Sequence, residues 1–143
     1  MKKETEKLLR ECTSGTKMGE RALSMAIPYV KNAELKSALE ESLKSHAIIG
    51  DEAKKALFSA HRRDKEPNAI VQMMSDAKMK AMLTFNSSPS TVAGLITDGC
   101  DMGTKTLAHA LNSHPTADPS ARRLARQLIA TEDNLRESLR RFL

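Results

Sequence analysis

Four long segments of this chain place mainly apolar residues at alternating steps of four and three, and this spacing restricts the fold more than any other feature. Residues at these steps lie on one stripe of an α-helix. The clearest example is the last segment, whose stripe consists of Ala121, Ala125, Leu128, Glu132, Leu135, Leu139 and Phe142. The sequence therefore predicts an all-α protein whose helices pack along such stripes.

Turn residues divide the chain into five predicted helices. The four long ones span about residues 5–29, 33–61, 89–111 and 119–142. At a rise of about 1.5 Å per residue, each is roughly 35–43 Å long, whereas a fifth helix at about 69–85 reaches only about 25 Å. We therefore predict one domain, residues 1–143, in which the long helices form a four-helix bundle. The short helix should lie in a long crossover between the second and third long helices.

Prolines and cap residues mark several of the predicted helix ends. Ser88-Pro89 and Asp118-Pro119 each combine an N-cap residue with a proline in the first helical turn. Pro28 should bend or end the first helix. The crossover helix carries its apolar residues on one side, namely Ile70, Met73, Met74, Ala77 and Ala81. We expect Met73 and Met74 to fill gaps in the core.

Composition favours a cytoplasmic protein with no membrane partner. Hydrophobic residues make up 40% of the chain and aromatic residues only 3%, so aliphatic side chains and methionine must form the core. We find no signal peptide and no apolar run of about 18 residues, the length that a membrane span requires. Cys12 and Cys100 lack a paired spacing, and we expect both to be small buried hydrophobes in a reducing compartment.

The formal net charge of +5 raises the question of nucleic-acid binding. The last predicted helix carries a series of arginines, namely Arg122, Arg123, Arg126, Arg136, Arg140 and Arg141. Such a face can bind phosphates. However, Glu132, Asp133 and Glu137 are interleaved with the arginines, and aromatic residues for base stacking are missing. The sequence therefore favours a solvated helix face over a nucleic-acid interface.

Several segments of the chain match the pattern of a known superfamily. They are Glu11 to Gly15 in the first helix, Asn32 to Lys36 at the start of the second, His46, and Ala130 to Leu139 in the fourth. With these segments the chain resembles the ferritin-like superfamily, in particular its small bacterial four-helix-bundle proteins. The resemblance covers essentially the whole chain and implies a ferritin-like bundle. Di-iron members of the superfamily bind metal through a Glu from each of two helices and a Glu-x-x-His from each of the other two.

This chain lacks most of that ligand set. Leu43 stands three residues before His46, and Leu135 stands three residues after Glu132. The inward positions of the first and third long helices are glycines, namely Gly15, Gly19, Gly99 and Gly103. We therefore expect neither di-iron oxidase activity nor a bound cofactor. His46 and Glu132 are the residual candidates for a degenerate metal site.

His46 and Glu132 each interrupt an otherwise apolar stripe. We expect His46 to be a core histidine with a hydrogen-bond partner; a metal ligand and an exposed ring are the alternatives. Glu132 is expected at the edge of the bundle, because Arg136 one turn later can pair with it. If both residues point inward, they could pair as imidazolium and carboxylate. For residues that act separately, His46→Leu and Glu132→Leu should change stability additively.

The four inward glycines also need an explanation, because glycine inside a helix costs about 1 kcal/mol relative to alanine. Close approach of neighbouring helices is the expected reason. The alternative is an internal cavity, or a ligand at the place where a di-iron protein holds its metals.

These observations support three functional hypotheses. The leading one is a non-enzymatic helical bundle that acts through protein–protein contacts, as a homo-oligomer or scaffold, with the crossover methionines as a contact surface. The second is a metal- or small-molecule-binding bundle that retains His46, Glu132 and a glycine-lined centre. Nucleic-acid binding through the basic last helix is the third and least favoured.

Overall fold

The computed structural model describes all 143 residues, and its regular structure is entirely helical. The α-helices are α1 (Lys3–Ala26), α2 (Ala33–Ser59), α3 (Ala69–Phe85), α4 (Pro89–Ser113) and α5 (Pro119–Leu139). Two 3-10 turns, η1 (Ile27–Tyr29) and η2 (Arg140–Phe142), extend α1 and α5. The all-α prediction is confirmed, and the helix ends lie at or within a few residues of their predicted positions. None of the helices is long and apolar enough to cross a lipid bilayer.

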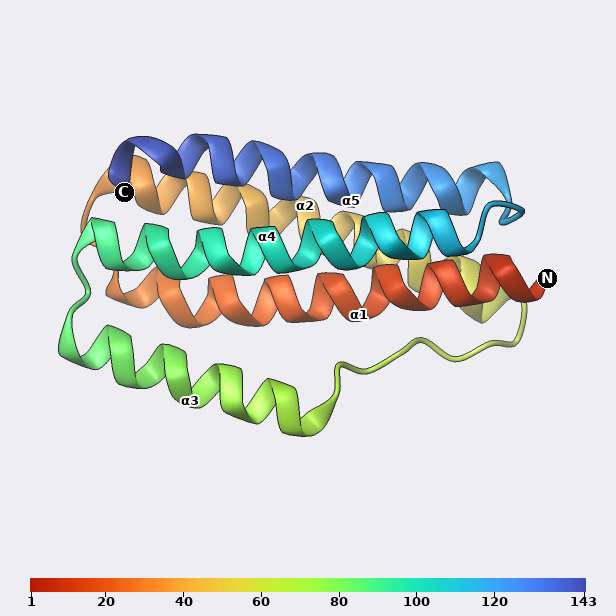
Figure 1. The fold of residues 1–143 in the computed structure, drawn as a ribbon, viewed down its shortest axis with the longest axis horizontal. Helices are drawn as coiled ribbons and strands as arrows, with labels where there is room; N and C mark the ends of the chain where they lie inside the picture. Colours follow the sequence, from red (N-terminus) through yellow and green to blue (C-terminus); the bar gives the residue numbers. More distant parts are fainter.

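The four long helices lie side by side, and α3 runs outside them along α1 (Figure 1). α1 packs most extensively on α2, and α4 on α5, so each consecutive pair forms an antiparallel hairpin. Residues 60–88 carry the chain from one end of the molecule back to the other (Figure 1). Because of this return, α2 and α4 run in the same direction. The arrangement is therefore two hairpins joined by one crossover that contains α3.

Ser88 caps α4 as predicted, and asparagines cap α2 and α3 in the same way. Asn32, Asn68 and Ser88 each accept a hydrogen bond from a backbone N–H in the first turn of α2, α3 and α4, respectively. α1 ends at Ala26, and Pro28 lies in the 3-10 turn that follows. Asp118 and Pro119 take the predicted N-cap and first-turn positions of α5, although the Asp118 side chain makes no capping hydrogen bond. The backbone N–H of Asp118 donates to Thr5 Oγ1 at 2.8 Å.

The buried apolar residues form two separate clusters, one in each half of the bundle. One cluster includes Leu9, Ile49, Leu57, Leu107 and Leu128. The other includes Leu23, Leu39, Ile96, Leu135 and Leu139. On α1, α2 and α5, the buried residues between the two clusters are polar, among them Thr16, Ser42, His46 and Glu132. A polar level therefore crosses the middle of the core.

α3 faces the other helices with the side opposite to the one predicted. Met73 and Met74 are 70% and 68% exposed, so the expectation that they fill core gaps is wrong. Ile70 on the same side is also exposed, whereas Met79 and Leu83 are the only buried residues of α3. The inner side also carries Asp76, which forms an ion pair with Arg21 of α1 at 2.6 Å. α3 therefore packs on the other helices through two apolar residues and an ion pair.

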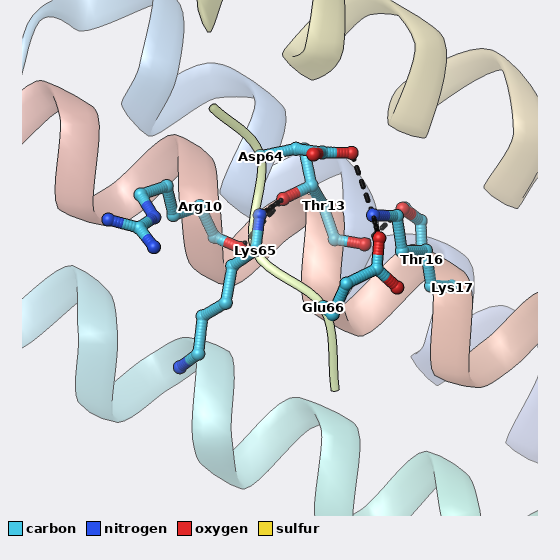
Figure 2. A network of polar contacts seen from close by, with 7 residues as sticks. All are labelled: Arg10, Thr13, Thr16, Lys17, Asp64, Lys65 and Glu66. Atoms are coloured by element: carbon cyan, nitrogen blue, oxygen red, sulfur yellow. Dashed lines mark hydrogen bonds and ion pairs between the residues drawn. The ribbon is translucent and has the colours of Figure 1, made fainter. Parts of the chain in front are cut away.

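Ion pairs and one backbone hydrogen bond hold the chain between α2 and α3 against α1 (Figure 2). Lys17 Nζ contacts the carboxylates of both Asp64, at 2.7 Å, and Glu66. The backbone N–H of Lys65 donates to Thr13 Oγ1 at 3.1 Å, and Lys65 Nζ lies 2.6 Å from Glu11 Oε1. The crossover therefore follows α1 through polar contacts and touches the core only through α3.

Candidate functional site

His46 of α2 lies at the centre of the polar level and is 1% exposed. Its Nδ1 is 2.8 Å from the backbone carbonyl oxygen of Ser42, which can only accept, so Nδ1 carries a proton. Its Nε2 is 2.8 Å from Glu132 Oε1 on α5. Both ring nitrogens are therefore engaged. The prediction that His46 is a core histidine with a hydrogen-bond partner is confirmed by this geometry.

The expectation that Glu132 lies at the bundle edge with Arg136 is wrong. Glu132 is 7% exposed and turns inward to His46. Arg136 instead binds Asp101 Oδ1 at 2.9 Å and Asp133 Oδ1 at 2.7 Å. Because other carboxylates satisfy Arg136, Glu132 is left to pair with the only basic group at this level of the core. The structure thus brings together the two residues singled out from the sequence.

The pair combines a buried imidazole with a buried carboxylate. Burial lowers the pKa of His46. The hydrogen bond to Glu132 and the negative charge of Glu132 raise it by more, so the pKa of His46 lies above its ordinary value. Nε2 therefore holds its proton more tightly than a free imidazole does, and it donates this proton to the carboxylate. The site is an imidazolium–carboxylate ion pair, which a low-dielectric core tolerates because each charge is partnered.

Gly19 makes room for this pair, and Gly103 lies beside it. A Cβ on Gly19 would stand 2.4 Å from His46 Cδ2 and 2.5 Å from its Nε2. At Gly19 the neighbouring helix α2 thus comes close, as expected, and it does so through a side chain. A Cβ on Gly103 would stand 3.4 Å from Glu132 Oε1, an ordinary van der Waals distance, so the space there would admit a Cβ.

Gly99 has a different role, because a Cβ there would meet no atom within 4 Å. It lines a cavity of about 230 Å³ between α1, α3 and α4, which reaches the surface beside exposed Asp98 and Met102. His46 and Glu132 form its inner wall, and Gln72 and Met79 of α3 form its outer wall. The sequence suggested an internal cavity at the glycine-lined centre as the alternative; the structure has a cavity there, but it is open to the surface at the exposed Gly99.

Cys100 on α4 also lines the cavity, a role that its sequence position did not reveal. Burial and the neighbouring Glu132 carboxylate raise the pKa of its thiol far above the ordinary value. Burial likewise raises the pKa of Cys12 to about 12. Both thiols are protonated at neutral pH and are poor nucleophiles. No disulfide joins them.

His46 and Glu132 do not assemble a conventional metal site. No group of three or more His, Cys, Asp or Glu side chains is placed to hold a metal ion. In addition, the ring nitrogens of His46 are committed to Ser42 and Glu132. A metal ion here would have to replace their mutual hydrogen bond.

The arginines of the last helix are mostly engaged with neighbouring groups. Arg123 pairs with Glu52, Arg140 with Glu137, and Arg141 with Glu34. Arg122 donates to the backbone carbonyl oxygens of Leu111 and His114 at the end of α4. Such pairing leaves little free positive charge for phosphates, which disfavours a nucleic-acid interface on α5.

Neither a protein-family model, nor a curated protein, nor a solved structure matches this chain. The ferritin-like assignment therefore stays a prediction, and the function has to be inferred from the geometry of the site.

The glycines provide a matched test of the site geometry. Gly19→Ala should lower the free energy of unfolding by about 1–3 kcal/mol, because the new Cβ collides with a ring that two hydrogen bonds hold in place. Gly99→Ala and Gly94→Ala should each raise it by up to about 1 kcal/mol, since neither Cβ meets a neighbour and alanine favours the helix. Urea unfolding of the three variants measures these changes. A stabilised Gly19→Ala protein would contradict the placement of His46.

A double-mutant cycle tests the ion pair. His46→Leu and Glu132→Leu should each lower the free energy of unfolding by about 3 kcal/mol, because each leaves its partner buried and unpaired. The double variant should lose less unfolding free energy than the two single variants lose together. The coupling energy should exceed about 1 kcal/mol, contrary to the additivity expected from the sequence. Because the folded pKa of His46 is raised, the coupling is complete below about pH 6.5 and is lost as pH rises through the folded value. Additive losses, or coupling that grows with pH, would rule out the pair.

Proposed function

We propose that this chain is a non-enzymatic helical bundle that binds a compact, largely apolar small molecule in the cavity between α1, α3 and α4. The observation that carries the proposal is a cavity of about 230 Å³ that includes a buried ion pair in its wall. For comparison, an apolar cavity of about 150 Å³ holds benzene. Ligand sites are typically apolar with a few placed polar groups, and here Met18, Met79 and Leu135 surround Glu132.

Binding is favoured over catalysis by the chemistry of the wall. The cavity contains the Cys100 thiol, whose raised pKa makes it a weak nucleophile. The His46 ring is not free to act as a base, because both of its nitrogens are engaged. The arrangement of two hairpins and a crossover is the one that ferritin-like bundles use. We therefore place this protein in that group as a metal-free relative, and two unbridged cysteines support a reducing, cytoplasmic location.

Small neutral probes test the proposed binding site. Toluene and benzyl alcohol, titrated into ¹⁵N-labelled protein, should shift the backbone amide signals of the four cavity glycines, namely Gly15, Gly19, Gly99 and Gly103. The amides of Gly50 and Gly94, which do not line the cavity, are internal controls. Gly99→Leu should fill the cavity and abolish the shifts, whereas Gly94→Leu should retain them. Equal shifts at all six glycines, or none, would count against the site.

Self-association is a second candidate function, and the exposed apolar side of α3 favours it. Ile70, Met73 and Met74 are 68–70% exposed on a helix that has few apolar contacts of its own. A twofold axis through Ala77 would place Met73 of one copy opposite Ala81 of the other, and Ala81 opposite Met73. This alternation of large and small residues suits an isologous contact between two copies.

The mass in solution tests this second candidate. Light scattering at high protein concentration should give twice the chain mass, and Met73→Glu should give the mass of one chain, because a buried glutamate without a partner opposes the contact. Ile48→Glu on α2 is the matched control, since Ile48 is equally exposed but lies away from α3. A single-chain mass at every concentration would exclude the dimer.

A further inference from the structure

The cavity presents an acceptor, rather than a donor, as its innermost polar group. Both residues line the cavity, but Glu132 is 7% exposed and His46 only 1%, so the carboxylate is the more accessible member of the pair. His46 packs against Gly19, and its Nε2 proton is directed to Glu132 Oε1. A carboxylate accepts up to four hydrogen bonds, and His46 uses only part of that capacity.

The opposite wall adds a second acceptor. Gln72 of α3 donates through Nε2 to Asp76 Oδ1 at 2.8 Å, while its Oε1 is buried and has no donor. At the mouth, Asp98 is exposed and has no ion-pair partner, whereas the carboxylates of Glu11 and Asp76 are paired with Lys65 and Arg21. Lys78 is the one basic residue of the lining besides His46. A hydrogen-bond donor therefore suits this cavity better than an acceptor.

We infer that the cavity selects a small apolar molecule that carries a protonated amine, and that the ammonium group binds Glu132. This inference rests on the proposed small-molecule function and names its ligand class. An anionic ligand would face the Glu132 carboxylate across a low-dielectric cavity and be repelled. An ammonium group instead supplies donors to a carboxylate, the stronger kind of hydrogen bond.

Charge balance adds a proton exchange to this binding step. Without ligand, the imidazolium of His46 neutralises Glu132; when an ammonium group takes over that role, the Nε2 proton of His46 becomes a surplus buried charge. That proton leaves to solvent, while Nδ1 keeps its own proton and still donates it to Ser42 O. Other titratable groups surround His46 on every side: Glu20 on α1, Cys100 on α4, and, across the cavity, Glu11, Asp76, Lys78 and Asp98. None of them replaces Glu132, the one carboxylate in contact with the ring.

Three nearly isosteric probes test the inference: benzylamine, benzyl alcohol and benzoate, which carry a positive, no and a negative charge. Dissociation constants come from the amide shifts of Gly99 and Gly103. Benzylamine should bind at least about tenfold more tightly than benzyl alcohol, as expected when a charge-assisted hydrogen bond replaces a neutral one. Benzoate should bind most weakly. Benzylamine affinity should also rise with pH, by up to about tenfold per unit, as His46 loses its proton.

Variants distinguish direct binding of the ammonium group to Glu132 from attraction by negative charge at the opening of the cavity. Glu132→Gln should remove the preference, so that benzylamine and benzyl alcohol bind with equal affinity. Asp98→Asn should reduce the preference only slightly, and Glu137→Gln, an exposed change elsewhere on α5, should not affect it. If Glu132→Gln fails to fold, the pH dependence with unmodified protein decides, because benzyl alcohol binding should lack it.

The outcomes distinguish the preference for an amine from the existence of the binding site. If benzyl alcohol and benzylamine bind the cavity glycines equally, the amine inference is overturned and the binding site stands. Affinity for benzylamine that falls with rising pH also overturns it. If no probe shifts the cavity glycines, the proposed function itself fails.

Discussion

The ion pair between His46 and Glu132 is the interaction on which the centre of this molecule depends. It joins α2 to α5 across the bundle at a level where no other polar group can replace either partner. A shift of either helix by one turn would bring one charge against leucines of the adjacent apolar cluster. The pair therefore fixes the axial register of these helices, the best-attested role of buried polar groups in helical bundles.

The cavity lies directly beside this pair. The imidazole ring requires Gly19 on α1 and fills the space there. The open volume lies instead at Gly99 on α4, where a Cβ would meet no atom within 4 Å. α3 closes this volume only partly, since its inner side is short of apolar residues.

Periodicity in the sequence was sufficient to predict the helices, their connections and the inward direction of His46. It did not predict the partner of Glu132. Spacing along α5 makes Arg136 the nearest candidate, yet Asp101 of α4 competes for that arginine from a distant part of the sequence. The orientation of α3 was missed for the same reason, because its apolar side is clear in the sequence while Arg21, which binds its other side, lies on α1. Local patterns describe a helix well, but the face that turns inward also depends on partners from other helices.

The ion pairs of the crossover carry information about topology. From the N-terminus of α1 onward, the α1 residues that pair with the crossover are first acidic and then basic. Their partners in the crossover, which runs alongside in the same direction, are first basic and then acidic. The pairs are Glu6 with Arg62, Glu11 with Lys65, Lys17 with Glu66, and Arg21 with Asp76. A crossover laid over the opposite side of the hairpins would form the mirror-image connection and lose all four pairs. Exposed ion pairs contribute little to stability one at a time, yet their order here distinguishes the handedness of the fold from its alternative.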